Sequence, residues 1–454
     1  MIWRLAMGFV LAGTLTVQAD DWPQWLGPQR DSVWRETGIV SRFPKSGLRV
    51  VWRAALAEGY AGPAVANDRV YVTDWVRDPE AKPPASPFDT SALLGGRERV
   101  HCLDARNGKP LWSHEYECAY KVSYAAGPRC TPTIANGRVY TLGTMGDLFC
   151  LNADDGKPLW HRKFPKDFGA KVPVWGFSSH PLVDGELLIC LVGGANGSLV
   201  VAFEAATGKE RWRSLTTTDD AHGCGYAPPV IAEVGKTRQL IIWHPEGISS
   251  LDPQTGKEFW TVPFKLRSGL SIPTPRVHGD RLFVTAFYNG PMMLQLAQDQ
   301  PAARILWRAK ENVNERRTEG LHSIMSSPFI RDGHIYGVCS YGQLRCLRLD
   351  TGERVWESLR ATSRLNKPKE ERWGNAFIVS HDDRFFLFNE HGELILARLT
   401  PDGYEELDRL LIVQPTNPLV NRPVVWSHPA FARKCIFARN DREIVCVSLA
   451  AEEY

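Results

Sequence analysis

The feature that most constrains this chain is a turn that recurs just before a tryptophan. Its fullest copy is Asp-Thr-Gly-Glu-Arg-Val-Trp at residues 350–356. The same Gly-to-Trp spacing recurs at Gly108 and Trp112, Gly156 and Trp160, Gly208 and Trp212, and Gly256 and Trp260, while Gly403 keeps it with Leu407 in place of the Trp. A short polar residue followed by a glycine, which adopts positive φ freely, is typical of the turn between two antiparallel strands.

A small residue stands six positions before each of these glycines: Cys102, Cys150, Ala202, Ser250, Cys346 and Ala397. Further back, a polar turn such as Asn136-Gly137 leads into an apolar run, and a proline opens many copies: Pro63, Pro132, Pro181, Pro228, Pro275, Pro328 and Pro429. Each copy therefore predicts four short strands in 48 residues, judged from Trp112 to Trp160. That period is typical of propeller blades.

The copies predict an all-β, eight-bladed propeller of four-stranded antiparallel blades over residues 50–449. Complete copies occupy residues 60–112, 127–160, 175–212, 223–260, 270–307, 320–356 and 373–407, and the last, 426–449, supplies only three strands. Val50, Val51, Trp52 and Arg53 resemble an outer strand with no blade before it. We expect these four residues to pair with residues 443–448 and close the ring, which leaves no free sheet edge.

Blades splay outward like wedges, so a large flat side chain is expected to fill the gap between neighbours. This is the role we expect for the tryptophans of the outer strands: Trp52, Trp112, Trp160, Trp212, Trp260, Trp307 and Trp356. Residues 20–49 predict an irregular segment lying against the propeller, and residues 450–454 a short tail. Residues 74–99, 163–175, 310–319, 358–372 and 413–425 lengthen loops and connections, which we expect to gather on one face where binding usually occurs.

Residues 1–19 have the pattern of a secretory signal peptide: Arg4, an apolar stretch over residues 5–17, and small residues ending at Ala19. No cysteine follows the predicted cleavage site, so no lipid anchor is expected there, and no later run is long enough to span a bilayer. We expect a periplasmic or secreted monomer. The formal net charge of +3, without a basic stripe interleaved with aromatics, gives no indication of a nucleic-acid partner.

Ten cysteines in an exported protein raise the question of disulfides. Cys102, Cys150 and Cys346 occupy the small-residue position of separate blades, and Cys446 sits at the matching place in the last copy. Equivalent positions of different blades lie too far apart for a disulfide, so these four are expected to be buried small hydrophobes. Cys118 and Cys130 flank a connection between blades and are the pair that spacing favours for a disulfide.

The combined pattern of Pro, apolar strand, Asn/Asp-Gly, Val-Tyr, small-Leu-Asp and Thr-Gly-Lys-x-x-Trp resembles the PQQ-like β-propeller repeat family, named for pyrroloquinoline quinone (PQQ). The resemblance is strongest over residues 127–160, 180–212 and 327–356. It implies one of two classes. Quinoprotein dehydrogenases hold PQQ and Ca²⁺ in the channel, whereas non-catalytic propellers resemble the lipoprotein that assists outer-membrane protein assembly. The opening Trp22-Pro23-x-Trp25-x-Gly27-Pro28 also looks like that of exported bacterial members.

The chain departs from the dehydrogenase pattern, since it has neither an adjacent Cys pair nor a Cys-x-x-Cys-His haem attachment sequence. In a quinoprotein, Glu204, Asp252 and Glu319 could supply oxygen ligands to Ca²⁺. Glu204 and Asp252, however, lie in the repeated turns, where acidic side chains cap the backbone.

Aromatic and histidine residues precede the inner-strand proline or its equivalent in several copies: Trp175, His180, Tyr226, His322, Trp373, Trp426 and His428. With the blades in register, these residues ring the channel mouth and form a concave site for a flat ligand or a peptide segment. Alternatively, they pack between blades or cap strand ends. His180 and His428 lack the short spacing of metal ligands, and no hydrolase or phosphate-loop motif occurs.

We therefore expect an exported, non-catalytic propeller that presents loops around its channel to an envelope protein or a small ligand. No catalytic residue and no metal site are expected. The alternative is a PQQ-dependent quinoprotein oxidoreductase of the alcohol or sugar dehydrogenase type, the only case in which PQQ and Ca²⁺ are expected as cofactors.

Overall fold

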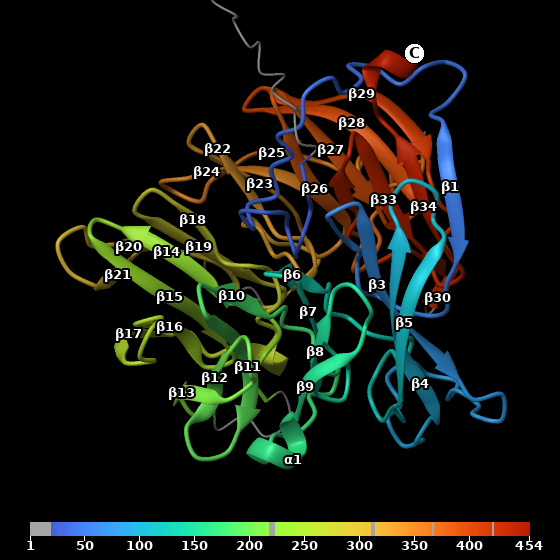
Figure 1. The fold of residues 1–454 in the computed structure, drawn as a ribbon. Helices are drawn as coiled ribbons and strands as arrows, with labels where there is room; N and C mark the ends of the chain where they lie inside the picture. The colour runs from blue at the N-terminus through green and yellow to red at the C-terminus, as the bar shows by residue number, and fades with distance from the viewer. Residues whose placement is uncertain (1–19, 218–222, 310–313, 366, 420–421) are drawn as a thin grey trace, which may run out of the picture.

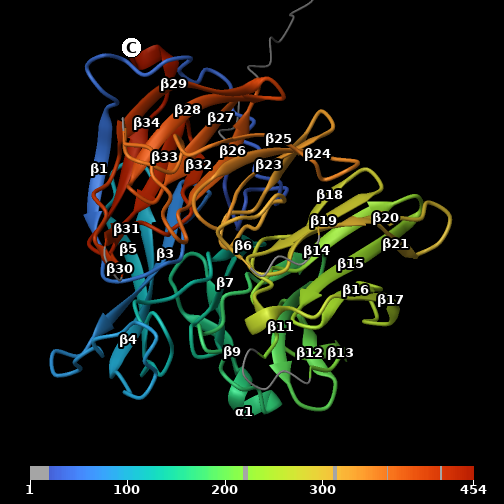
Figure 2. The ribbon, with the colours of Figure 1, turned by 180° about the vertical axis from the view of Figure 1, so that it is seen from behind.

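The computed structural model describes residues 20–217, 223–309, 314–365, 367–419 and 422–454, so the predicted signal peptide lies outside the described residues. Eight four-stranded antiparallel sheets follow one another round a ring in chain order (Figures 1 and 2). The predicted eight-bladed propeller is confirmed. None of the described helices is long and apolar enough to cross a membrane.

The first four blades consist of β2 (Ala64–Ala66), β3 (Arg69–Arg77), β4 (Gly96–Asp104) and β5 (Pro110–Glu117); β6 (Thr133–Ala135), β7 (Arg138–Leu142), β8 (Asp147–Asn152) and β9 (Pro158–Lys163); β10 (Leu182–Asp184), β11 (Leu187–Gly194), β12 (Ser198–Glu204) and β13 (Glu210–Ser214); and β14 (Val230–Val234), β15 (Thr237–His244), β16 (Gly247–Leu251) and β17 (Glu258–Pro263). A short helix, α1 (Phe164–Phe168), lies in the connection after β9.

The other four blades consist of β18 (Arg276–His278), β19 (Arg281–Ala286), β20 (Gly290–Leu296) and β21 (Ala303–Arg308); β22 (Phe329–Arg331), β23 (His334–Val338), β24 (Leu344–Arg348) and β25 (Arg354–Ser358); β26 (Ala376–His381), β27 (Arg384–Asn389), β28 (Glu393–Thr400) and β29 (Gly403–Leu411); and β32 (Ala430–Ala432), β33 (Cys435–Arg439) and β34 (Glu443–Ser448), completed by β1 (Val50–Ala55). A two-stranded ribbon, β30 (Asn417–Leu419) and β31 (Arg422–Val424), and two 3₁₀ turns, Arg267–Gly269 and Ala451–Glu453, lie outside the blades.

The ring is closed by β1, as the sequence predicts. Trp52 pairs with Cys446 and Arg53 with Val445, so the N-terminal strand forms the outer edge of the C-terminal blade. Figure 1 shows the blue β1 beside the red β33 and β34. Because the last blade takes strands from both parts of the chain, β1 and the C-terminal strands are tied together by an antiparallel ladder, interrupted once between Val50 and Trp52.

The recurrent glycine marks the joint between successive blades. Trp112 at the outer edge of the first blade donates its indole Nε1–H to the carbonyl oxygen of Ala153 in the next blade, at 3.0 Å. A Cβ added to Gly156 would lie 2.4 Å from that indole. The indoles of Trp52, Trp160, Trp212 and Trp307 stand similarly close over Gly108, Gly208, Gly256 and Gly352 of their next blades. Each turn therefore needs glycine because the preceding blade's tryptophan rests on it.

The small residue of the repeat faces the tryptophan of its own blade. Cys102 is the cross-strand partner of Trp112, and Cys150 that of Trp160. A bulge follows at once in both ladders. Three joints depart from the rule. Trp260 donates to Gln239 Oε1 of its own blade at 2.9 Å, and Leu407 replaces the indole in the seventh blade. Trp356 donates to the Thr400 carbonyl of the seventh blade, but a Cβ on Gly403 would meet nothing within 4 Å.

Residues 22–34 of the irregular N-terminal segment, here called the plug, run across one end of the channel. Trp22 pairs with Val65 of the first blade, and the Pro23 carbonyl accepts a hydrogen bond from the backbone N–H of Ile134 in the second. Arg30 donates to the carbonyls of Pro181 and Pro229, at 3.2 and 3.4 Å. Further contacts reach the fifth, seventh and eighth blades through Arg276, Ser380 and Phe431. The plug is thus held by the inner edges of seven blades.

All ten cysteines are free thiols, so the predicted Cys118–Cys130 disulfide is wrong. The two residues are buried in different clusters. Cys118 packs beside Trp75 and Tyr120, whereas the Cys130 thiol faces the carbonyl of Ser179 in the third blade, at 3.5 Å. The prediction for Cys102, Cys150, Cys346 and Cys446 holds, since each is buried as a small apolar residue.

Candidate binding cavity in the channel

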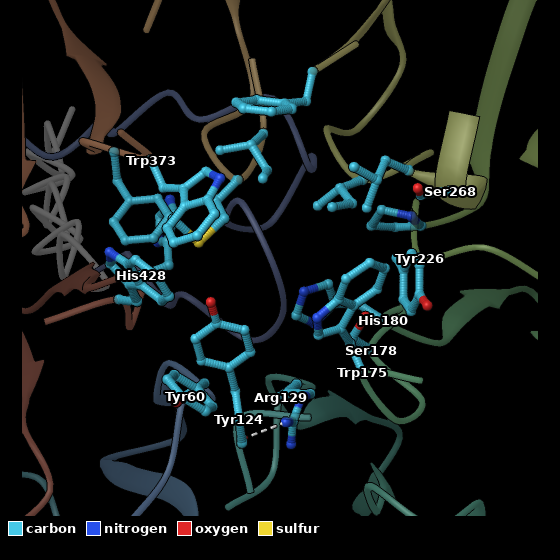
Figure 3. A pocket seen from close by; sticks show the side chains of 18 of the residues that line it. Tyr60, Tyr124, Arg129, Trp175, Ser178, His180, Tyr226, Ser268, Trp373 and His428 are labelled. Carbon is cyan, nitrogen blue, oxygen red and sulfur yellow. Dashed lines mark hydrogen bonds between the residues drawn. The ribbon is translucent and has the colours of Figure 1, made fainter. Parts of the chain in front are cut away.

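A cavity of about 340 Å³ lies in the channel above the plug (Figure 3). Every blade contributes to it through the connection that enters its inner strand. Its aromatic lining consists of Trp25, Tyr60, Phe88, Tyr124, Trp175, Tyr226, Phe287, Tyr288, Trp373, Phe377 and Trp426. The walls are therefore mostly ring faces, which suit a flat apolar body.

Six of the seven residues predicted to ring the channel mouth line this cavity: Trp175, His180, Tyr226, Trp373, Trp426 and His428. His322 does not. It is 1% exposed and hydrogen-bonded through Nδ1 to the Phe287 carbonyl at 3.0 Å, behind the hairpin whose Phe287 and Tyr288 line the cavity in its place. Whether the six residues bind a ligand remains a prediction.

Trp25 of the plug forms the floor between two histidines. Its indole stacks on the His180 ring at 4.0 Å with an angle of 9° between the planes, and lies 4.9 Å from the His428 ring. Its Nε1–H donates to Thr274 Oγ1 at 2.9 Å, which fixes the indole in the channel. The opening Trp-Pro-x-Trp pattern thus supplies part of the site itself.

Both floor histidines are neutral, with the proton on different nitrogens. Burial, then the charge of Arg30, holds the pKa of His180 well below its ordinary value, and burial lowers the pKa of His428 to about 4. The backbone N–H of Thr131 donates to His180 Nδ1 at 2.9 Å, so the His180 proton sits on Nε2. His428 donates from Nδ1 to the Pro429 carbonyl at 2.6 Å, which leaves its Nε2 bare.

These histidines should make the fold acid-sensitive. The unfolded chain protonates a histidine near pH 6.5, whereas folded His428 has a pKa of about 4, as do His244 and His322. Between these values the unfolded state binds more protons, so stability is full above pH 6.5 and falls as the pH drops. We expect a loss of roughly 2 kcal/mol per such ring by about pH 4.5.

Urea unfolding measured from pH 7 to pH 4.5 checks this expectation. The variant His428→Phe should reduce the loss of stability by about the share of one ring, since His244 and His322 remain, and His278→Phe, which changes an exposed ring, should leave the pH dependence as in the parent protein. Equal pH profiles for the two variants would contradict the role assigned to His428.

The insertion in the first blade, residues 78–95 between β3 and β4, reaches over the cavity. Its Pro87 carbonyl accepts hydrogen bonds from the Tyr124 backbone N–H at 2.8 Å and the Ser123 hydroxyl at 2.9 Å. Phe88 then packs on Tyr124, at 5.3 Å between ring centroids, and on Trp373 of the seventh blade at 5.9 Å. The loop thereby links two separated sectors of the wall.

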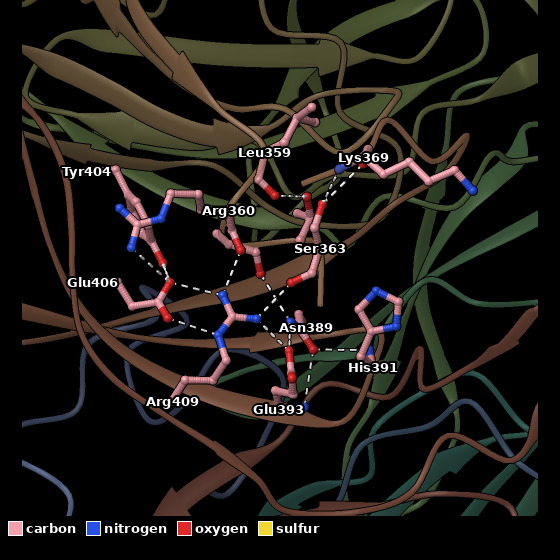
Figure 4. Close-up of polar contacts among 12 residues, drawn as sticks. Leu359, Arg360, Ser363, Lys369, Asn389, His391, Glu393, Tyr404, Glu406 and Arg409 are labelled. Atoms are coloured by element: carbon pink, nitrogen blue, oxygen red, sulfur yellow. Dashed lines mark hydrogen bonds and ion pairs between the residues drawn. The ribbon is translucent and has the colours of Figure 1, made fainter. Parts of the chain in front are cut away.

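The seventh-blade side of the wall is held by buried ion pairs. Arg409 of β29 pairs with Glu393 and Glu406 and donates to the carbonyls of Arg360 and Ser363, which anchors the connection leading to Trp373 (Figure 4). Trp426 donates its indole N–H to buried Glu390 at 3.2 Å. The Glu390 contact therefore holds Trp426, and the Arg409 contacts hold residues 360–363 of the connection that leads to Trp373.

A single cation contributes to the described lining. Arg129 is the one charged residue among the lining residues that the structure describes. Its guanidinium lies over the Tyr60 ring at 5.2 Å and donates to the Ser123 and Tyr124 carbonyls. Thr131, two residues further along, ties the same inter-blade connection to His180 through its backbone N–H. The cation and this floor histidine are therefore held by one connection.

The lining does not fit the Ca²⁺–PQQ pair of a quinoprotein. No carboxylate is among the described lining residues, and no group of three or more His, Cys, Asp or Glu within the described ranges could hold a metal ion. Asp252 and Glu204 accept hydrogen bonds within their own turns, from the Gln254 backbone N–H and the Thr207 hydroxyl, and Glu319 pairs with Arg354. Protein Ca²⁺ sites are built largely from carboxylate and carbonyl oxygens, and the side chains of the described lining offer hydroxyl oxygens but no carboxylate.

Sequence and fold comparisons place the chain among propellers. The sequence matches the family described as outer membrane protein assembly factor BamB over residues 36–117 and 96–358. No curated protein matches it. The structure of BamB from Moraxella catarrhalis is similar, with a TM-score of 0.51 and 14% identity, covering 83% of this chain and 98% of that one.

Two further solved structures are similar. The quinohemoprotein alcohol dehydrogenase from Comamonas testosteroni has a TM-score of 0.58 and 13% identity, covering 95% of this chain and 80% of that one. The computationally designed Ika8 protein has a TM-score of 0.50 and 9% identity, covering 88% of this chain and 99% of that one. At such identities the structural matches show the fold alone.

Proposed function

Since this chain belongs to the family of the outer membrane protein assembly factor BamB, we propose that it is an exported, non-catalytic binding propeller. Its channel cavity holds a small flat ligand or an aromatic side chain of an envelope protein. The proposal of export draws on the signal-like residues 1–19.

The observation that carries this proposal is the convergence of ring faces on one cavity. Tyr60, Trp175, Trp373 and Trp426 reach it from four different inter-blade connections, and Trp25 reaches it from the plug. Aromatic walls with few polar groups are typical of binding sites that recognise shape and stacking. The two floor imidazoles are fixed by backbone partners, so they serve recognition better than proton transfer.

Capture of envelope components tests the proposal. The purified protein, immobilised, should retain a defined component from an envelope extract. The double variant Trp373→Ala/Trp426→Ala should bind this component roughly thirtyfold more weakly, because stacking contributes about 1 kcal/mol per ring. The double variant Leu111→Ala/Leu159→Ala is the matched control, since it removes two exposed apolar side chains from outer strands, 49% and 48% exposed. Equal retention by both double variants would contradict the proposal.

The quinone-dependent oxidoreductase is the other class that the sequence resemblance implies. With no carboxylate among the described lining residues, we expect PQQ and Ca²⁺ added to the purified protein to leave no bound chromophore after gel filtration and no dye-linked alcohol oxidation. Stoichiometric binding with turnover would replace the binding proposal by the enzymatic one.

A further inference from the structure

The polar groups of the cavity restrict the chemical class of ligand that it can bind. The aromatic rings cover most of the wall, but the polar groups are unevenly placed. Arg129 and His180 lie on the same side, joined through the hydrogen bond from the Thr131 backbone N–H to the His180 ring. Figure 3 shows His180 near Tyr226 and Trp175, across the cavity from His428, and Arg129 beside Tyr124.

The hydrogen-bond donors on the side of Arg129 and His180 are one positively charged group and one neutral group. His180 offers an Nε2–H, because its Nδ1 accepts from Thr131. Arg129 carries a full charge and is partly exposed. Its hydrogen bonds go to carbonyl and hydroxyl oxygens, so no carboxylate of the described residues neutralises it directly.

Two more guanidinium groups lie beneath the floor. Arg30 donates to the carbonyls of Pro181 and Pro229 and approaches that of His180 at 3.5 Å. Arg276 donates to the carbonyls of Arg30 and Asp31. Burial lowers the pKa of both guanidinium groups to about 10, as expected for cations held largely by neutral oxygens. Their field reaches the cavity through protein of low polarity, where charges are weakly screened.

We propose that the cavity selects a flat aromatic acid, bound without a metal ion, with its ring between the aromatic walls and its carboxylate toward Arg129 and the His180 Nε2–H. This inference rests on the proposed binding function and adds the ligand class to it. The proposed site therefore differs from a quinoprotein site, in which Ca²⁺ is bound together with PQQ. An aromatic cation, although favoured by ring faces alone, is rejected by the surrounding guanidinium charges.

A charge series on one ring system tests the inference with the unmodified protein. Naphthalene-2-carboxylate, 2-naphthamide and (naphthalen-2-yl)methylammonium have nearly the same shape and carry negative, zero and positive charge. Calorimetric titration, in chelator and again in added Ca²⁺, should show the acid binding about tenfold tighter than the amide and the ammonium weakest, since one partly screened charge contact is worth about that much. Ca²⁺ should change none of these affinities.

Arg129→Met should reduce the preference for the acid over the amide, taken as the ratio of the two affinities measured on the same variant, to about threefold or less. Lys121→Met is the matched control, an exposed charge on the same inter-blade connection, and should keep the full preference. Thermal melts of both variants verify that they fold. If Arg129→Met does not fold, the charge series on the parent protein decides alone.

The possible results distinguish a failure of this inference from a failure of the proposed binding function. If the three probes bind equally, or the ammonium binds best, the inference is overturned while the aromatic binding cavity stands. If the acid binds only with Ca²⁺, the metal-free site is overturned. If none of the three binds, the binding function proposed for the cavity fails as well.

Discussion

Replacing Gly156 by alanine is expected to cost about 3 kcal/mol of folding free energy, from a strained backbone and an overpacked joint together. Gly156 has a φ of +72°, and its new Cβ would lie 2.4 Å from the Trp112 indole of the preceding blade. The indole cannot withdraw without breaking its hydrogen bond to the Ala153 carbonyl.

The matched control is Gly137→Ala in the same blade. Gly137 has nearly the same φ, +71°, but a Cβ there meets nothing within 4 Å. Only the backbone strain remains, about 1 kcal/mol. Urea unfolding of the two variants separates the cost of backbone strain from the cost of overpacking against the Trp112 indole. Equal destabilisation would mean that the indole-on-glycine contact does not hold the blades together.

Replacing Arg30 by methionine is expected to cost about 3 kcal/mol, because the carbonyls of Pro181 and Pro229 lose their donor inside the channel. Arg35→Met is the control in the same segment. Arg35 is exposed, its ion pair with Asp31 lies at the surface, and its loss should cost under about 1 kcal/mol.

Urea unfolding measures both losses, and hydrogen exchange of the Trp25 indole N–H adds a local readout. In Arg30→Met this N–H should exchange faster than global unfolding allows, as water reaches the floor. An Arg30→Met protein as stable as Arg35→Met would show that the plug is not locked by this guanidinium.

The repeat made the blades and their closure predictable because it records local chemistry. Gly352 and Trp356, for example, mark a turn and an outer strand within one copy. The meaning of the glycine was not predictable in the same way. The side chain that excludes a Cβ at Gly352 is Trp307 of the blade before, a contact between copies rather than within one.

The cavity was predictable where it follows the repeat. Trp175, Tyr226 and Trp426 precede inner strands, and the same rule applied to Pro63 finds Tyr60, which the sequence interpretation left out. His322 also precedes an inner strand, but the hairpin that carries Phe287 lies between it and the cavity. No position of the repeat predicts this difference.

Residues from outside the repeat could not be placed from sequence. Trp25 reaches the floor through the plug, and Phe88 reaches Trp373 through the first-blade insertion. Both depend on long-range packing of irregular segments. The failed Cys118–Cys130 pairing has the same origin, because proximity in the chain does not give proximity between clusters.

The central claim is that the aromatic cavity above the plug is the binding site of this propeller. Calorimetric titration with neutral 2-naphthamide, comparing the parent protein with Trp373→Ala/Trp426→Ala, tests it most directly. We expect the double variant to bind at least about tenfold more weakly while still melting cooperatively as a folded protein. Equal affinity in the two proteins would contradict the claim.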